Sequence, residues 1–321
     1  MKKFIQKLVL FVSPVILSAY FIDIFISHNL KKSNSYAHKD YACWNLIMDG
    51  KLNSDVVIYG SSRACLQINP AIVSDSLNTT AYNLGINGHN FWLQYLKHSL
   101  LLQNNTKPKL IIHSVDAFTL EKRGDLYNSE QFLPYMLFND KIKKVTSSYQ
   151  GFNFLDYEIP LARYYGKADA FLALIKLLIN PGGNEPGRIK GYEAMDIKWT
   201  DEFEKAREQM GFYEARIDTP SFLLFEKYLT ECKAKNIKII LVYTPEYIGG
   251  QGFIKNRNDI ISMYKGFSEK FNIPFYDYSK DSLSFQRKYF YNSTHLNKTG
   301  TDIFAKELVS KIKTDGILAD F

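Results

Sequence analysis

Residues 56–63 read Val-Val-Ile-Tyr-Gly-Ser-Ser-Arg, and this stretch indicates both a strand and a candidate site. Its first four residues are β-branched or aromatic, which is typical of a buried strand, and the glycine and serines after them favour a turn. Far along the chain, residues 292–295 read Asn-Ser-Thr-His and precede an amphipathic helix expected at 301–312. In an open parallel sheet both stretches lie at the carboxyl edge of the strands, where such folds place their sites. A serine nucleophile can meet its histidine base there.

The same alternation of short apolar strands and helices extends along much of the chain. Strands are expected at residues 55–59, 81–84, 110–115, 237–243 and 274–278. Helices are expected at residues 70–77, 90–103, 222–234, 260–271 and 301–312. Short apolar strands that alternate with helices predict an α/β fold with a five-stranded parallel sheet covered on both faces.

Residues 118–220, between the third and fourth strands, do not follow this alternation. They are rich in tyrosine and phenylalanine and mostly helical in pattern, and a Pro/Gly-rich loop at 180–187 divides them. Because structureless loops of this length are rare in compact domains, we expect a helical cap inserted over the carboxyl edge of the sheet. Within it, residues 170–179 are apolar nearly all round. They are either buried or pressed onto a membrane surface, and burial is favoured.

The N-terminal segment at residues 8–27 has a single charged residue, Asp23, and one proline, and it is long enough to cross a hydrocarbon core of about 30 Å. Three basic residues precede it: Lys2, Lys3 and Lys7. This charge pattern is typical of an end held in the cytoplasm. We therefore expect residues 1–30 to be a cytoplasmic tip and an uncleaved signal anchor, residues 31–52 a juxtamembrane segment, and residues 53–321 an extracytoplasmic domain. A cleaved signal peptide is the alternative, with a shorter apolar region and small residues before its cut site.

The composition, 46% hydrophobic and 23% charged, is that of a globular protein. The net charge of +7 comes from scattered residues, so nucleic-acid binding is not expected. The three cysteines show no metal or disulfide spacing. A metal site made by His89, His113, Asp116 and His295 is an alternative, but no local pair of ligands supports it. His113 lies inside a predicted strand, where a core histidine is the usual outcome, so we expect neither a metal nor a cofactor.

Three blocks resemble the motifs of the SGNH/GDSL hydrolase superfamily, and within it the membrane-anchored branch that acts in cell-envelope polymer acylation. Gly60-Ser61-Ser62 resembles the first block, whose last serine is the nucleophile, and is similar to the form found in the teichoic-acid D-alanyl-transfer protein. Residues 83–88 resemble the second block, which points to Gly88, with Asn87 beside it, as an oxyanion-hole donor. Residues 292–295 resemble the last block, which implies His295 as the base. The resemblance implies a flavodoxin-like three-layer sandwich.

The chain departs from the family pattern in the last block. Asn292 stands where the family usually has the aspartate that orients the histidine, and an amide cannot balance an imidazolium charge. Three outcomes are open. The site works as a dyad, another carboxylate such as Asp277 or Glu246 orients His295, or activity is lost.

A second departure concerns the third block, where the family's asparagine is missing and Asp116 stands near its place. An ionised carboxylate would repel an oxyanion rather than donate to it, and Asp116 could instead pair with Arg63. Five residues are therefore candidates to support Ser62 and His295 in the site: Arg63, Asn87, Asp116, Glu246 and Asp277.

Together, these residues predict serine-dependent transfer of an acyl group, most simply acetyl, to or from a cell-envelope polysaccharide outside the cytoplasm. Ser62 would form the acyl-enzyme, His295 would move the proton, and the amides of Ser62 and Gly88 would hold the oxyanion. A plain carbohydrate esterase or deacetylase and a non-catalytic scaffold are the alternatives. The resemblance implies the membrane, the polysaccharide and a multispanning membrane-bound O-acyltransferase as partners.

Overall fold

The computed structural model describes residues 1–88, 91–180 and 188–318. His89, the expected helix start at Asn90 and most of the predicted loop at 180–187 lie outside the described residues. The chain forms two compact units, one made by residues 1–45 and 123–187 and the other by residues 46–122 and 188–321. The second unit thus takes in the last part of the segment that the sequence assigned to a cap.

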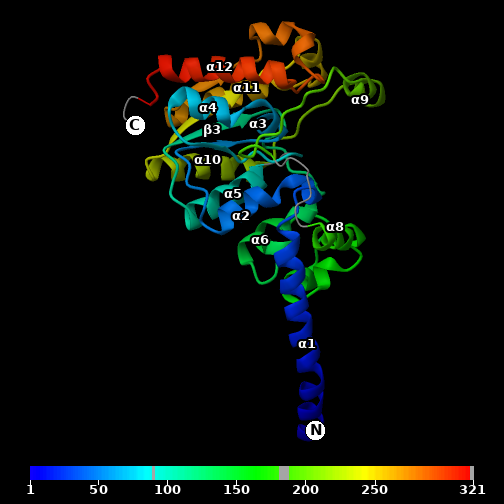
Figure 1. The fold of residues 1–321 in the computed structure, drawn as a ribbon. Coiled ribbons are helices and arrows are strands. Elements are labelled where there is room, and N and C mark those ends of the chain that lie inside the picture. The colour runs from blue at the N-terminus through cyan, green and yellow to red at the C-terminus, as the bar shows by residue number, and fades with distance from the viewer. Residues whose placement is uncertain (89–90, 181–187, 319–321) are drawn as a thin grey trace. The chain divides into compact units, whose positions relative to one another are not determined.

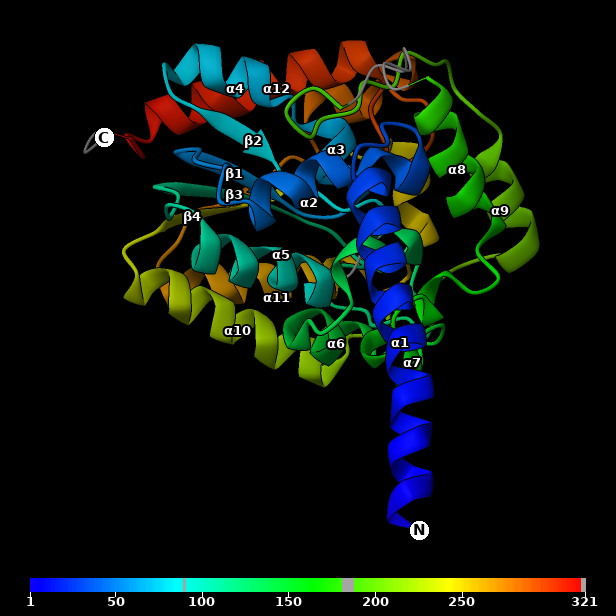
Figure 2. The same ribbon diagram turned by 60° about the horizontal axis from the view of Figure 1, so that its bottom comes forward.

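The second unit contains the predicted five-stranded parallel sheet. Its strands are β1 (Val56–Tyr59), β2 (Ala81–Asn83), β3 (Leu110–Val115), β4 (Lys238–Tyr243) and β5 (Phe275–Asp277). They run in the order β2-β1-β3-β4-β5, with every neighbouring pair parallel. Figure 1 shows the whole fold, and Figure 2 labels β2, β1, β3 and β4 in this order. Each strand lies within one residue of its predicted bounds at both ends, so the α/β prediction is confirmed.

Helices cover both faces of this sheet (Figure 2). One face carries α4 (Pro70–Leu77) and α12 (Lys298–Thr314). The other carries α5 (Phe91–Asn104), α10 (Thr219–Ala234) and α11 (Arg257–Phe271). All five were predicted to within three residues at each end, and the largest differences are the first turns of α10, α11 and α12. At the start of α12, for example, Asn297 accepts a hydrogen bond from the Gly300 N–H at 3.0 Å and so caps the helix.

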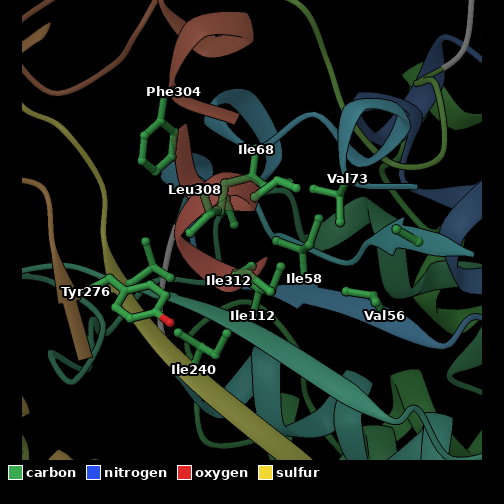
Figure 3. Close-up of a cluster of buried hydrophobic side chains, with 14 of the residues drawn as sticks. Val56, Ile58, Ile68, Val73, Ile112, Ile240, Tyr276, Phe304, Leu308 and Ile312 are labelled. Atoms are coloured by element: carbon green, nitrogen blue, oxygen red, sulfur yellow. The ribbon is translucent and has the colours of Figure 1, made fainter. Parts of the chain in front are cut away.

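The core on the α4–α12 face consists of strand residues packed against helix residues (Figure 3). Ile58 and Ile112 are paired in the sheet and contribute to this cluster, as do Phe304 and Leu308 of α12. These residues are fully buried. Such packing of α12 against the sheet fixes the helix whose N-terminal loop carries His295.

A short helix, α3 (Ser62–Gln67), follows the first strand and was not predicted. Gly60 precedes it with a φ of +143°, a conformation that favours glycine. A Cβ at this position would lie 2.5 Å from the Ser114 carbonyl oxygen, so only glycine fits the turn. Ser61 caps α3 by accepting a hydrogen bond from the Arg63 N–H at 3.2 Å. The turn therefore places Ser62 in the first turn of the helix.

The remaining elements of the second unit are short. They are α9 (Glu202–Met210), η4 (Ile248–Phe253), η5 (Ser282–Phe285) and η6 (Arg287–Tyr289). The first unit is helical, with α1 (Lys2–Leu30), η1 (Tyr36–Lys39), η2 (Ser129–Tyr135), α6 (Asp140–Thr146), α7 (Phe154–Glu158), η3 (Ala162–Tyr164) and α8 (Ala168–Ile179). The helix α2 (Tyr41–Met48) crosses the boundary between the units.

One helix among the described residues, α1, is long and apolar enough to cross a membrane. Its single acidic residue, Asp23, is buried within the first unit. Arg163 donates hydrogen bonds to both Asp23 carboxylate oxygens, at 2.7 and 2.6 Å, and to Ser27 Oγ at 3.0 Å. The charge inside the apolar segment is therefore paired within the protein.

The expected burial of residues 170–179 is wrong. Only Ala170 and Leu174 of α8 are buried, and the helix packs against α1. Five large apolar side chains of α8 are exposed: Phe171, Leu172, Ile175, Leu178 and Ile179. High hydrophobicity on every side gave no indication of which face would pack.

Candidate active site

Ser62 and His295 are hydrogen-bonded in the second unit, although they lie 233 positions apart in the sequence. Ser62 Oγ is 2.8 Å from His295 Nε2. Ser62 opens α3 after β1, and His295 lies in the loop between η6 and α12. The Tyr291 ring stacks on the imidazole with 5.4 Å between ring centroids and 11° between planes. The geometry is that of a serine hydroxyl facing a potential base.

Asn292 fixes the protonation pattern of the His295 ring. The Asn292 Oδ1 atom accepts hydrogen bonds from the backbone N–H groups of Thr294 at 3.1 Å and of His295 at 2.9 Å. The same oxygen lies 3.0 Å from His295 Nδ1. An amide oxygen can only accept, so Nδ1 carries the proton and Nε2 presents its lone pair to Ser62.

A carboxylate reaches this group from a helix that sequence reasoning did not connect with it. Asn292 Nδ2 donates a hydrogen bond to Glu202 Oε2 at 2.7 Å. Glu202 is the first residue of α9 and lies 90 positions before Asn292. No motif or spacing marks Glu202 in the sequence, because its position depends on the path of an irregular segment.

Glu246, a predicted candidate for orienting His295, is engaged elsewhere. Its Oε1 atom accepts hydrogen bonds from Arg63 Nη1 and from the Tyr243 hydroxyl, the latter at 3.0 Å. Its Oε2 atom accepts one from Arg257 Nε at 2.9 Å. All four side chains are buried, so Glu246 serves a charged network beside the site rather than the imidazole.

Asp277 does not contact His295 either. It is exposed at the end of β5, and its Oδ1 atom accepts a hydrogen bond from the Ser279 N–H at 3.0 Å. This local turn satisfies the carboxylate where the strand ends. In the structure, Glu202 is therefore the carboxylate that reaches the histidine, and it does so through Asn292.

The expected pair between Asp116 and Arg63 is also corrected. The buried Asp116 carboxylate accepts hydrogen bonds from Ser61 Oγ and from the Phe118 N–H, the latter at 2.8 Å. Arg63 instead donates to Thr244 Oγ1 at 2.9 Å, to the Thr244 carbonyl and to Glu246. Ser61 thus bridges Asp116 and the first turn of α3, and this bridge holds the backbone of Ser62.

Burial, and then the positive charge of Arg63, lower the pKa of His295 to about 3. Burial disfavours the charged imidazolium, and a nearby cation adds to that effect. The imidazole is therefore neutral at ordinary pH. A neutral imidazole with a free Nε2 lone pair can accept the serine proton.

Gly88 lies in a half-buried turn after β2 with a φ of +86°, and Asn87 precedes it. Asn83 connects the start of this loop to α3. Its Nδ2 atom donates to the Ala64 and Ile68 carbonyls, both at 2.8 Å, and its Oδ1 atom accepts from the Gly85 N–H at 2.9 Å. The loop that carries Gly88 is thus fixed to the helix that begins with Ser62. The role of Gly88 as an oxyanion donor stays a prediction.

A cavity of about 230 Å³ adjoins the Asn292 side of the site. Its lining includes aromatic side chains, Phe118, Phe203 and Phe253, and the charged residues Glu202, Glu246 and Arg257. Asn292 and Thr294, which contact Nδ1 of the imidazole, also line it. This volume suits a small group.

In the described part of the chain, no three His, Cys, Asp or Glu side chains gather in a way that could hold a metal ion. His113 is fully buried, and its two ring nitrogens lie 3.1 Å from the Tyr228 hydroxyl and 2.9 Å from Gln94 Oε1. It is a core histidine, as the sequence indicated.

No family model and no curated protein matches the chain. Among solved structures, it is similar to a GDSL-like lipase from Bacteroides thetaiotaomicron, with 14% identity, 85% of this chain and 97% of the other covered, and a TM-score of 0.37. A proposed acylhydrolase from Bacteroides fragilis matches at 15% identity, with 87% and 99% covered and a TM-score of 0.35. A proposed lipolytic protein of the G-D-S-L family from Desulfitobacterium hafniense matches at 13% identity, with 80% and 98% covered and a TM-score of 0.36. At these identities and TM-scores, the likeness establishes neither a family nor an activity for the chain.

Proposed function

We propose that the chain is a serine-dependent acyltransferase or esterase in which Ser62 is the nucleophile and His295 the general base. The observation that carries this proposal is the 2.8 Å hydrogen bond from Ser62 Oγ to an Nε2 atom left unprotonated by the contact of Nδ1 with Asn292. A serine hydroxyl is a weak nucleophile until such a base takes its proton. Assembly of this pair from distant segments supports an enzyme over a scaffold.

The reaction proceeds in two half-reactions. Ser62 Oγ attacks the acyl carbonyl carbon while its proton passes to His295 Nε2. The bond between the carbonyl carbon and the donor alcohol then breaks, and the alcohol leaves with the proton from Nε2. An acceptor hydroxyl then loses its proton to Nε2 and attacks the acyl-enzyme. The Oγ–acyl bond breaks, and Nε2 returns the proton to Ser62 Oγ. The Ser62 amide, in the first turn of α3, has no partner inside the helix and is available to the oxyanion together with Gly88. One such donor typically contributes about 2.7–4 kcal/mol to lowering the barrier.

The acceptor we propose is a cell-envelope polysaccharide, and the acyl group is acetyl. The span-length helix α1 supports a chain anchored in the membrane with its catalytic domain outside the cytoplasm. The small cavity beside Asn292 favours a short acyl group or a single sugar unit over a long acyl chain. A multispanning membrane-bound O-acyltransferase is the donor partner that the resemblance in the sequence implies. A carbohydrate esterase, with water as the acceptor, shares the first half-reaction.

Labelling of the full-length protein in membranes with a fluorophosphonate probe tests the nucleophile. We expect labelling of the wild type and of Ser262→Ala, a control at an exposed serine of α11, and none of Ser62→Ala. Equal labelling of Ser62→Ala would overturn the assignment. Release of acetate from an acetylated probe, with and without added polysaccharide, then separates transfer from hydrolysis.

A further inference from the structure

We propose that Glu202 is a positioning residue for His295 and acts through Asn292. The amide and the carboxylate together replace the single orienting aspartate of a serine triad. This proposal deepens the proposed function and rests on it.

Four side chains form a continuous hydrogen-bonded chain. Glu202 Oε2 lies 2.7 Å from Asn292 Nδ2, Asn292 Oδ1 lies 3.0 Å from His295 Nδ1, and His295 Nε2 lies 2.8 Å from Ser62 Oγ. The Asn292 amide cannot turn over within this arrangement. An ionised carboxylate only accepts and the backbone N–H groups of Thr294 and His295 only donate, so each end of the amide has one possible orientation.

Charge gives this chain a second effect. When His295 takes the serine proton, a neutral amide offers only its dipole to the new imidazolium, and loss of a carboxylate at this place is costly in other triads. The negative charge of Glu202 polarises the amide and strengthens the bond from Oδ1 to Nδ1. Because Glu202 is exposed while Asn292 is buried, solvent screens part of this effect.

The start of α9 is held against the histidine loop, which keeps Glu202 in place. The Thr200 N–H donates to the Tyr291 carbonyl at 2.6 Å, and Tyr291 itself stacks on His295. Two residues beyond Glu202, Glu204 accepts hydrogen bonds from Trp199 at 3.2 Å and from Arg287 at 3.3 Å. These contacts set the register of the helix N-terminus relative to Asn292.

A reciprocal exchange of amide and carboxylate tests the proposal in the full-length protein. We expect Glu202→Gln to slow fluorophosphonate labelling about tenfold, the low end of the effect that hydrogen-bond partners have at histidines that bind metals. Asn292→Asp alone places two carboxylates face to face, where they must share a proton and compete for it. The double variant Asn292→Asp/Glu202→Gln restores one carboxylate and one amide. We expect it to label faster than Asn292→Asp alone, with the difference growing toward high pH.

Glu208→Gln, at another exposed glutamate of α9, is the matched control and should label like the wild type. A Glu202→Gln rate and pH profile equal to those of the control, with no gain in the double variant, would overturn the proposal. Exchange of the His295 Nδ1 proton, followed by NMR and assigned with His295→Gln, needs no activity. Faster exchange in Glu202→Gln supports the positioning role, and unchanged exchange contradicts it, even if Ser62 proves not to be the nucleophile.

A separate observation in the first unit supports a second proposal. We infer that the exposed apolar face of α8 lies in the surface of the lipid bilayer. This face consists of Phe171, Leu172, Ile175, Leu178 and Ile179, and Ile179 is 79% exposed. Exposed apolar patches of this kind mark interaction surfaces, among them surfaces that contact a membrane.

The position of this face on α1 indicates lipid as the occupant. Every one of residues 4–22 except Ala19 is exposed, and this part of α1 is roughly 28 Å long, close to the thickness of the hydrocarbon core. Burial of α1 begins at Asp23, and α8 packs against α1 (Figure 1). The apolar face therefore continues the lipid-facing surface of the span from the boundary of the bilayer, where interfacial helices lie.

Depth measurements in liposomes test this inference. The three native cysteines are buried, so an environment-sensitive dye can be attached at Phe171→Cys or Ile175→Cys in the full-length protein. Nitroxide lipids labelled near the headgroup should quench both sites more than lipids labelled deep in the chain. Phe11→Cys, inside the span, should show the reverse order, and Ser262→Cys on α11 should not be quenched. Two results would overturn the inference. One is a fully hydrated dye at Ile175→Cys, and the other is a dye shielded from water but not quenched by lipid, because another protein copy covers it.

Discussion

Removal of Arg163 is predicted to destabilise the first unit by about 3–5 kcal/mol. The guanidinium and the Asp23 carboxylate form a buried ion pair with side chains 1% and 2% exposed. Arg163→Met leaves Asp23 with the Leu161 N–H, at 2.7 Å, and Ser27 as its remaining hydrogen-bond donors. An unpaired buried carboxylate carries most of its desolvation penalty, and this penalty sets the size of the expected loss.

The double variant Asp23→Leu/Arg163→Met separates pairing from burial. Replacement of both charges by apolar groups of similar volume is often neutral or stabilising, so we expect the double variant to be more stable than Arg163→Met alone. The coupling free energy between the two positions should then be a large part of the 3–5 kcal/mol estimate, well above that of about 0.2–1 kcal/mol for an exposed pair.

Tryptophan fluorescence can follow the first unit alone. Trp44 is buried there, with its Nε1 donating to Gln131 Oε1 at 3.0 Å, and the other two tryptophans, Trp92 and Trp199, belong to the second unit. With both of those changed to phenylalanine, urea unfolding in detergent reports on the surroundings of Trp44. If the effects of Asp23→Leu and Arg163→Met on the free energy of unfolding are additive, the argument is refuted, because the two residues then do not act as a pair.

Three further predictions concern the candidate site. Gly60→Ala should destabilise the second unit by more than 2 kcal/mol and abolish probe labelling, because the new Cβ would lie 2.5 Å from the Ser114 carbonyl oxygen; wild-type urea unfolding and labelling would contradict this. Ser62→Ala should lose labelling yet unfold within about 0.5 kcal/mol of the wild type, and a larger loss would indicate a structural serine. Because burial and the charge of Arg63 lower the pKa of His295, labelling should stay constant from pH 8 down to pH 6.5 and fall only in more acid solution, as the base becomes protonated. A decline that begins above pH 7 in a stopped-flow profile would show that the imidazole is not held neutral.

Most of the fold could be read from the sequence because burial on both faces leaves a plain signal. The strand expected at residues 237–243 is apolar apart from Lys238, and its observed bounds, Lys238–Tyr243, differ by one residue. The helix α3 escaped prediction because its six residues are too few to show a helical period. Its position depends on Gly60 and on the cap formed by Ser61.

The candidate site could also be predicted only in part. Ser62 and His295 could be placed together because the ends of parallel strands share one edge of the sheet. Glu202 could not, since its contact with Asn292 depends on the course of a segment without regular spacing. The exposure of α8 could not be predicted from the sequence either, because hydrophobicity measures preference for an apolar environment and does not distinguish a protein core from lipid.

The helix α9 buries none of its own residues, although it supplies the carboxylate that contacts Asn292. Substitutions on the exposed side of α9 therefore meet few packing constraints, and a change at Glu202 would still act on the reactivity of the serine. Two chains with identical residues at 60–62 and 292–295 could differ widely in rate through this helix alone. Comparison of their short motifs would class them as equal, and the difference would be found only by following the residue that hydrogen-bonds Asn292.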